Sequence, residues 1–280
     1  MMNEKLIEEI IYSVDVPPAI HQEIIDADWK EGCGLALLLK KEKKREVLVN
    51  EKEVPICLPS EELGFIRWIN RNTILVAAYG DENGEENLFV MNLNGEIIHS
   101  FHGGMATESI AVGKEGIWVS YFDEGTMGTG ISTEGLVLFD VTGKVLFRYH
   151  SDLLDSPEIF DCYAIGKGKG STLWLFPYTD FPLVLVNPKE RTSRSYSVPE
   201  KLRGSHGLCI RGKFAYFFDP YNSNRELYQL KIGEQEPQLI GTLQGRARGL
   251  DPSESCHFIA ITEQQVLLYQ VLNEDEYNFL

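Results

Sequence analysis

The feature that most constrains this chain is a pattern of strands that recurs about every 40 to 50 residues. Residues 108–151 show the pattern most clearly. A short run at 109–112 is followed by an aromatic-rich run at 117–122, and two further runs occupy 136–140 and 144–149. These runs are rich in β-branched and aromatic residues and are bounded by Gly, Asn or Asp, as strands are. The segment is therefore predicted to form four strands joined by turns.

Four other segments follow the same order of runs. In the first of them, Asn94-Gly95 separates two apolar runs, which is a strong short-range signal for a hairpin. The first strands of successive units start at about residues 64, 108, 161, 206 and 247, so the starts are about 44, 53, 45 and 41 residues apart. The repeat units are predicted at residues 64–104, 108–151, 161–199, 206–245 and 247–272.

Units of four strands with this period are typical of β-propeller blades. The chain resembles β-propellers over roughly residues 34–272, and the segment 117–125 is similar to segments of uncharacterised bacterial cytosolic propellers. It contains no WD dipeptide, kelch double glycine or Asp-box pattern, so the resemblance implies a fold and no activity. The predicted fold is all-β, a single propeller domain over residues 1–280 with four-stranded antiparallel blades.

The number of blades depends on the N-terminal segment. The last unit ends without an obvious fourth strand, and the run 45–50 lies where an outermost strand belongs. We expect this run to complete the last blade, as part of a closing hairpin at 34–55, because ring closure removes open sheet edges. An extra run at 35–40 leaves two counts open, five blades or six.

The first sixteen residues are predicted to form a short N-terminal helix. Apolar side chains fall on one helical stripe within residues 3–14, and Pro17-Pro18 follows. The stripe consists of Leu6, Ile7, Ile10, Ile11 and Val14. Two roles are open for such a helix, a cap on the propeller and a docking element for a partner.

Charge and cysteine content limit the possible partners and compartment. Asp and Glu number 42 against 26 Lys and Arg, giving a net charge of −16, which disfavours binding to nucleic acid or an anionic membrane. Glutamates interrupt the N-terminal apolar run, so no secretory signal is expected. The five cysteines lack disulfide or zinc spacing. We expect a cytoplasmic, monomeric protein.

The repeat alignment places four ionisable residues at one structural position, the start of each innermost strand. They are predicted to converge on one mouth of the central channel, where convergent polar groups could bind a ligand. The alternative is that a wet channel mouth carries polar residues without a specific role. The four residues are Glu108, Asp161, His206 and Arg248.

A second set lies where the second strand of a unit ends. In several units an aromatic residue is followed closely by Asp, and these loops should open on the same face as the strand starts. The pattern indicates an acidic, aromatic-rimmed cup for a cation, a sugar or a basic peptide; alternatively, these Asp residues only cap turns. The candidates are Tyr121, Asp123, Tyr178, Asp180 and Asp219.

Three functions remain open from the sequence. The leading one is a non-catalytic protein that binds a protein or small ligand at the channel mouth, without a cofactor. The second is a hydrolase, because a resemblance to lactonase-like propellers implies Ca²⁺ or Mg²⁺ held by Glu108 and Asp161. In that case one carboxylate acts as metal ligand or general base and His206 carries a proton, although Arg248 would compete with the ion. The third is an acidic neutraliser of a basic partner protein, suggested by the net charge alone.

Overall fold

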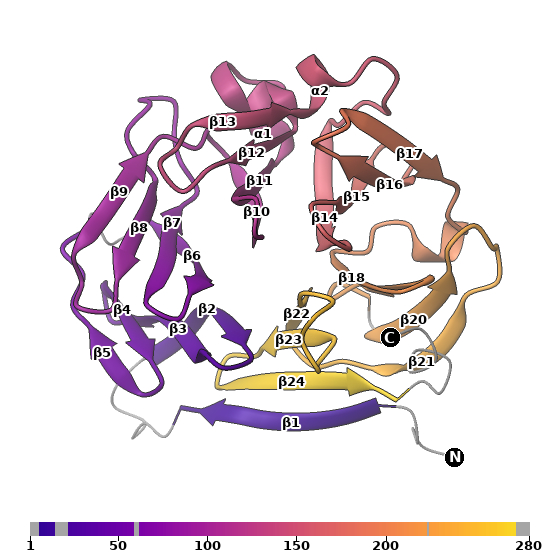
Figure 1. Ribbon diagram of the computed structural model, residues 1–280. Coiled ribbons are helices and arrows are strands. Elements are labelled where there is room, and N and C mark those ends of the chain that lie inside the picture. Colours follow the sequence, from indigo (N-terminus) through magenta and orange to yellow (C-terminus); the bar gives the residue numbers. More distant parts are fainter. Residues whose placement is uncertain (1–5, 15–21, 59–61, 223, 273–280) are drawn as a thin grey trace.

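The computed structural model describes residues 6–14, 22–58, 62–222 and 224–272. Six four-stranded antiparallel sheets are arranged in a ring around a central channel (Figure 1). Contacts between innermost strands follow the chain order around the ring, and β2 contacts β23 where the ring closes. The chain is therefore a β-propeller, as the repeat period predicts, and we number its blades 1 to 6 from the one that contains β2.

The first three blades follow one another along the chain. Their second strands contain a larger share of buried residues than their fourth strands. Blade 1 consists of β2 (Gln22–Lys30), β3 (Gly34–Lys41), β4 (Lys44–Val49) and β5 (Lys52–Val54). Blade 2 consists of β6 (Leu63–Asn70), β7 (Thr73–Ala78), β8 (Leu88–Asn92) and β9 (Ile97–Phe101). Blade 3 consists of β10 (Thr107–Val112), β11 (Ile117–Tyr121), β12 (Leu136–Phe139) and β13 (Val145–Arg148).

The last three blades complete the ring. Blade 4 consists of β14 (Asp161–Lys167), β15 (Leu173–Tyr178), β16 (Leu183–Asn187) and β17 (Thr192–Tyr196). Blade 5 consists of β18 (Gly207–Arg211), β19 (Phe214–Phe218), β20 (Glu226–Lys231) and β21 (Gln238–Thr242). Blade 6 consists of β22 (Arg246–Gly249), β23 (Phe258–Ile261), β24 (Gln265–Val271) and, from the other end of the chain, β1 (Leu6–Ser13).

Helices are short and lie in the connections between strands. Blade 3 carries α1 (Asp123–Thr126), the 3-10 turn η1 (Gly130–Glu134) and α2 (Tyr149–Asp152), and η2 (Glu200–Leu202) precedes blade 5. No helix in the described part of the chain is long and apolar enough to span a membrane.

The hydrophobic core is divided among the spaces between blades. Each of the six clusters of buried side chains combines residues from two neighbouring blades, so every blade is held by packing on both sides. For example, Trp118 of blade 3 packs in the same cluster as Leu175 of blade 4. Because both faces of a blade pack against neighbouring blades, successive side chains of a strand are buried on alternate faces. Many strands are therefore nearly continuous apolar runs.

The expectation of five blades is wrong, and the alternative of six is confirmed. The run 45–50 does not close the last blade, because β4 pairs with β3 and β5 inside blade 1. The repeat pattern does not reveal β2, because Asp26 and Asp28 interrupt its apolar run. Both carboxylates have partners that only the folded ring supplies, including the backbone N–H groups of Ile66 and Trp68.

The predicted N-terminal helix is wrong over the residues that the structure describes, and residues 1–5 and 15–16 lie outside them. Leu6–Ser13 is an extended strand that pairs with β24 from Leu6↔Val271 to Ser13↔Gln265. The free edge of β24 offers backbone hydrogen bonds, and this tertiary pairing outweighs a helical spacing of apolar residues. The predicted closure by an N-terminal strand is thus confirmed, with β1 in place of residues 45–50 (Figure 1, bottom).

The innermost strands β2, β6, β10, β14, β18 and β22 define two faces of the ring. We call the face where they begin the start face, and the other the end face. The second strands are antiparallel to the first, so their ends return to the start face: Tyr121 lies opposite Thr107, and Tyr178 opposite Asp161. Both predicted sets of site residues therefore belong to the start face.

Candidate ligand-binding site at the channel mouth

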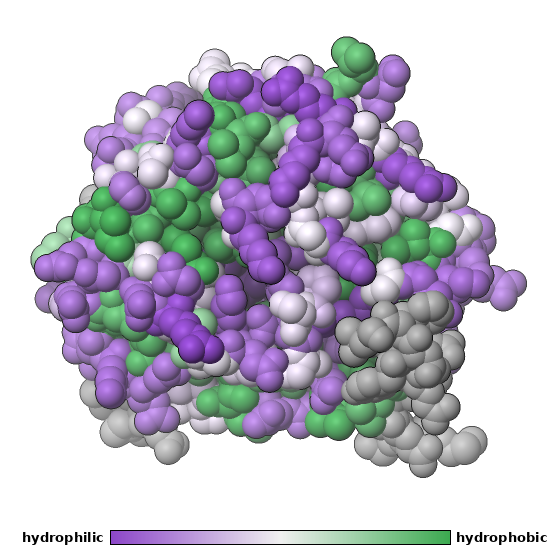
Figure 2. Space-filling view, in the orientation of Figure 1, coloured by the Kyte–Doolittle hydropathy of each residue, from purple (hydrophilic) through white to green (hydrophobic). Residues whose placement is uncertain are grey.

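The central channel widens at the start face into a cavity of about 220 Å³, which we call the mouth cavity. Residues from the innermost strands of all six blades line it, together with the loops after β7, β11 and β19. Figure 2 views the molecule from the end face, where the opposite opening of the channel is a hollow bordered largely by hydrophilic residues. A concavity with a few convergent polar groups is the usual form of a small-ligand site.

The blade 3 side of the mouth cavity is acidic. Glu108, the second residue of β10, lines the cavity, and its Oε2 atom is buried without a hydrogen-bond partner among the described residues. Burial raises the pKa of Glu108 to about 8, and the nearby charges of Asp161 and Glu124 add to this rise. A buried carboxyl without a partner is unusual in a folded protein, so this group has unused capacity to bind.

Asp161 lies behind Glu108 rather than on the cavity wall. It begins β14, and its Oδ1 atom is also buried without a partner among the described residues. Burial raises its pKa to about 6, with smaller contributions from Asp123 and Glu124 on α1. These residues form an acidic cluster, of which only Glu108 lines the cavity. Its four members are Glu108, Asp161, Asp123 and Glu124.

Aromatic rings cover the adjoining side, on blades 4 and 5. Tyr163 lines the cavity, with its ring centroid 4.5 Å from that of His206 and 6.1 Å from that of Tyr178 in a stacked arrangement. His206 in turn meets Tyr221, centroid to centroid, at 4.9 Å. Tyr178 and Tyr221 are both exposed, so the cluster forms a rim that a ligand could reach.

His206 connects the rim to a carboxylate. Its Nδ1 atom lies 3.9 Å from Oδ1 of Asp219, which also accepts a hydrogen bond from the backbone N–H of Tyr221. Burial lowers the pKa of His206, whereas the Asp219 charge acts in the opposite direction. The imidazole is therefore neutral near pH 7 and presents an uncharged ring to the cavity.

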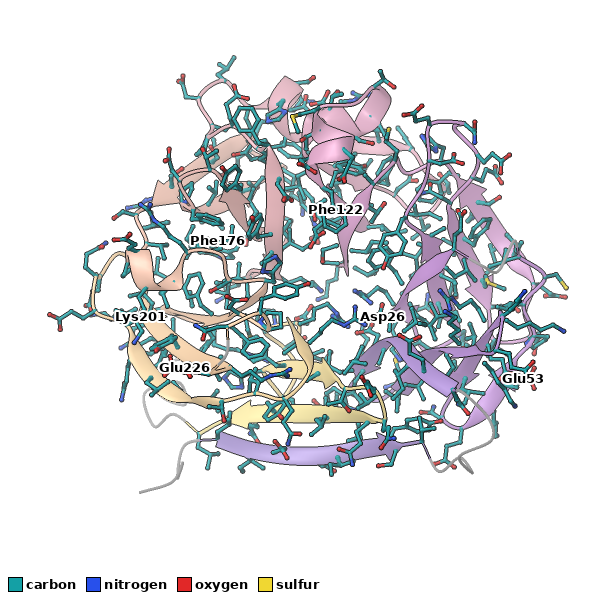
Figure 3. All side chains as sticks on the ribbon, turned by 180° about the vertical axis from the view of Figure 1, so that it is seen from behind. Asp26, Glu53, Phe122, Phe176, Lys201 and Glu226 are labelled. Carbon is teal, nitrogen blue, oxygen red and sulfur yellow. The ribbon has the colours of Figure 1, made fainter. Side chains whose placement is uncertain are left out.

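Three guanidinium groups also line the mouth cavity, those of Arg246 and Arg248 on blade 6, opposite Glu108, and that of Arg67 on blade 2, next to it. Arg67 is fully buried and forms an ion pair with Asp26, and its Nε atom donates to the Ile110 carbonyl at 2.8 Å. In Figure 3 Asp26 and Phe122 lie beside the channel on different blades.

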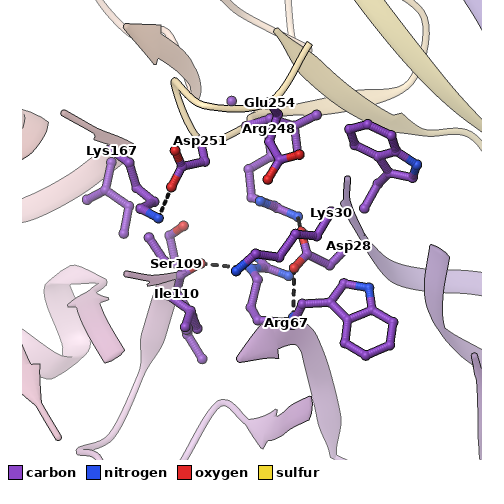
Figure 4. A pocket seen from close by; sticks show the side chains of 16 residues that line it. Asp28, Lys30, Arg67, Ser109, Ile110, Lys167, Arg248, Asp251 and Glu254 are labelled. Atoms are coloured by element: carbon purple, nitrogen blue, oxygen red, sulfur yellow. Dashed lines mark hydrogen bonds and ion pairs between the residues drawn. The ribbon is translucent and has the colours of Figure 1, made fainter. Parts of the chain in front are cut away.

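Arg248 lies deeper, at the waist of the channel. It donates to Oδ1 of Asp28 at 2.7 Å and to the Ala27 carbonyl at 3.0 Å. Arg248 lines both the mouth cavity and a smaller cavity of about 40 Å³ toward the end face. That smaller cavity is crossed by an ion pair between Lys167 and Asp251 (Figure 4). The Arg67–Asp26 pair fixes β2 against β6, and the Arg248–Asp28 pair fixes β2 against β22.

The structure brings together some of the predicted site residues and separates others. Glu108 and His206 line the mouth cavity, Asp161 and Asp123 lie in the acidic cluster behind Glu108, and Tyr178 and Asp219 support the aromatic rim. Arg248 lines the mouth cavity at its deep end, where it also borders the smaller cavity. Asp180 is exposed and has no contact with the cavity among those that the structure describes.

Tyr121, one of the predicted ligand-binding candidates, does not line the mouth cavity. Its side chain is fully buried, and its hydroxyl donates to the Gly103 carbonyl at 2.5 Å. Because Tyr121 points into the core between blades 2 and 3, the next residue along the chain, Phe122, lines the mouth cavity in its place.

Sequence reasoning missed several residues of the site. Arg246 is level with Thr107 and Asp161 in the strand pairing and occupies the place expected of Arg248. Tyr163 and Tyr221 were also missed, although each lies two residues after a predicted site residue, Asp161 or Asp219. Strand alternation does not point to either residue, because β14 has a bulge between Cys162 and Ala164 and Tyr221 lies in the loop after β19.

In the described part of the chain, no group of three or more His, Cys, Asp or Glu side chains is arranged to hold a metal ion. Glu108 and Asp161, the residues considered for Ca²⁺ or Mg²⁺, supply carboxylates from neighbouring strands without a third ligand of this kind.

Comparisons with known proteins establish the fold alone. No family model matches the chain, and no curated protein matches its sequence. Among solved structures, the chain is similar to virginiamycin B lyase from Staphylococcus aureus, with 10% identity, a TM-score of 0.59, and coverage of 96% of this chain and 100% of the lyase.

Two other solved structures are similar to the same extent. One is YCF48 bound to D1 peptide, with 10% identity, a TM-score of 0.55, and coverage of 98% of this chain and 99% of that one. The other is a chain of the mitotic checkpoint complex, with 11% identity, a TM-score of 0.61, and coverage of 92% of this chain and 77% of that one. An enzyme and a peptide-bound protein share this fold, so function must be argued from the site.

Proposed function

We propose that this protein is a binding protein whose mouth cavity takes a positively charged group, such as a primary amine, from a small molecule or a partner. The observation that carries the proposal is the buried Oε2 atom of Glu108, which lines the cavity and has no hydrogen-bond partner among the described residues. A bound ammonium group would supply both the missing donor and the charge that the acidic cluster lacks.

The aromatic rim supports the same class of ligand. A cation close to the face of a tyrosine ring gains about 0.5–2 kcal/mol, and more where water is excluded. Tyr163 lies beside the acidic cluster, and Tyr221 reaches the cavity from the loop after β19. Carboxylate and aromatic groups on adjoining walls are the combination that recognises an ammonium group in preference to a neutral one.

The experiment is calorimetric titration of the protein with n-butylammonium chloride at pH 8, with butanamide as a neutral probe of similar size. We expect n-butylammonium to bind and butanamide not to bind. In Glu108→Gln the affinity should fall at least tenfold, because the ligand loses its charged partner.

Net charge requires a matched control, since a protein with 16 excess negative charges attracts any cation. Glu53→Gln removes the same charge from an exposed position on β5. This variant should bind like the wild type. Equal losses in the two variants would refute a specific site and favour the acidic neutraliser, whose binding weakens with salt irrespective of the residue changed.

A second function, an acid–base enzyme, is favoured by one observation. Glu108 and His206 line the same cavity with pKa values displaced in opposite directions, so Glu108 holds a proton near pH 7 while His206 is free to accept one. Its test is hydrolysis of simple lactones by the purified protein. The hypothesis requires activity that is lost in both Glu108→Gln and His206→Gln and unchanged in Glu53→Gln.

A further inference from the structure

Glu108 and Arg246 line the mouth cavity from opposite blades. Glu108 belongs to β10 of blade 3, and Arg246 begins β22 of blade 6. In a ring of six, these blades lie three positions apart in either direction. Figure 1 shows β10 and β22 facing each other across the channel. The cavity therefore has an acidic wall and a basic wall on the same diameter.

The basic wall has an uncompensated charge. Arg67 is paired with Asp26 and Arg248 with Asp28, so these two guanidinium groups are neutralised within the protein. Arg246 makes no ion pair among the described residues; its Nη2 atom donates to the Ile25 carbonyl at 3.2 Å. A guanidinium has five N–H donors, so most of those on Arg246 remain available to an acceptor.

We infer that the ligand of the mouth cavity is a zwitterion, with an ammonium group held at Glu108 and a carboxylate held at Arg246. This inference rests on the proposed function, because it adds a second anchor to the amine site. Its chemical class is that of amino acids and of other molecules that carry an amine and a carboxylate a few bonds apart. A cavity of about 220 Å³ has room for a ligand of that size.

The charge distribution explains why one molecule should carry both groups. A simple amine would leave Arg246 without a partner, and a simple carboxylate would approach Arg246 under repulsion from the acidic cluster of Glu108, Asp161, Asp123 and Glu124. A zwitterion supplies an ammonium group to the acidic wall and a carboxylate to the basic wall. Two anchors on opposite walls also select for ligand length.

The test uses a series of ω-amino carboxylates, H₃N⁺–(CH₂)n–COO⁻, with n from 1 to 6, and alkylammonium ions of matched length. We expect one length to bind most tightly, at least tenfold more tightly than its alkylammonium match. In Arg246→Gln this advantage should disappear while the alkylammonium affinity stays the same. Arg194→Gln, on the outermost strand of blade 4, removes an equal charge and should retain the advantage.

The outcomes separate this inference from the proposed function. If alkylammonium ions bind through Glu108 but the amino carboxylates gain nothing at any length, the zwitterion inference is wrong and the amine site stands. The zwitterion inference is also wrong if Arg246→Gln leaves the gain intact. If neither series binds to wild-type protein whose melting temperature shows it to be folded, both the inference and the proposed function are wrong.

Discussion

The carboxyl groups of Glu108 and Asp161 lie on neighbouring innermost strands, and the Asp161 charge adds to the burial that keeps a proton on Glu108. The unfolded chain has no such arrangement, so it releases this proton at a much lower pH. The pair is therefore a source of pH-dependent stability, as well as the centre of the proposed site.

Stability should fall as pH rises from about 5 to about 8. The pKa of Glu108 is raised from an ordinary value of 4.5 to about 8 in the folded state, so between these values the unfolded chain loses a proton that the folded protein retains. Each unit of pKa difference corresponds to about 1.4 kcal/mol. In urea titrations over this pH range, the free energy of unfolding of Glu108→Gln should fall by on the order of 3 kcal/mol less than that of the wild type. Equal pH dependence in both proteins would show that Glu108 titrates normally.

The ion pair between Asp26 and Arg67 should be required for folding as a pair. Replacing Arg67 with Met leaves the Asp26 carboxylate buried without a counter-charge, which costs about 3–5 kcal/mol. Asp26→Leu should cost a similar amount, and the double variant less than the sum of the two. A denaturant double-mutant cycle measures this coupling; additive losses would contradict it. The exposed pair of Lys231 and Glu234 is the control, and Lys231→Ala should cost about 1 kcal/mol or less.

Strand β1 should act as a separable closing element. Removal of residues 1–13 exposes the edge of β24 and breaks the bond from the Tyr269 hydroxyl to Glu8, so the melting temperature should fall and aggregation increase. Addition of a synthetic peptide of residues 1–14 should restore part of the melting temperature. Full stability of the truncated protein would mean that closure contributes nothing.

Gly249 marks a close approach between blades 5 and 6. A Cβ atom at this position would lie 2.0 Å from the backbone carbonyl oxygen of Leu208. Since backbone cannot move aside easily, Gly249→Ala should destabilise the protein by about 1–3 kcal/mol. Gly113→Ala is the matched control, because the nearest atom to its Cβ would be the end of the flexible Glu115 side chain, at 3.2 Å, and the nearest backbone atom would be 3.9 Å away. Equal melting temperatures for both variants would refute this packing argument.

The sequence predicts blades 2 to 5 and three strands of blade 6, because most of these strands are apolar runs separated by clear turns. Blade 1 could not be predicted in the same way, because β2 carries Asp26 and Asp28 where an innermost strand should be apolar, and their partners Arg67 and Arg248 are distant in sequence. Strand β1 could not be recognised because its backbone partners belong to β24, at the other end of the chain.

The site shows a similar division. Glu108, Asp161 and His206 could be predicted because repeat alignment identifies equivalent strand starts. The alignment selects Arg248 in place of Arg246, an error of two residues along β22. Residues two apart point to the same side of a strand, so the alternation of apolar and polar residues cannot reveal this error. The burial that raises the pKa of Glu108 depends on packing between blades, which no local pattern reveals.

The most direct test of the proposed site is the number of protons released when an amine binds. At pH 7 Glu108 is mostly protonated, and an ammonium ligand must displace that proton to pair with the carboxylate. Calorimetric titration with n-butylammonium in two buffers of different ionisation enthalpy gives this number. We expect close to one proton released per ligand in the wild type and in Glu53→Gln, and none in Glu108→Gln. Binding without proton release, or binding that Glu108→Gln leaves unchanged, would contradict an amine site at the channel mouth.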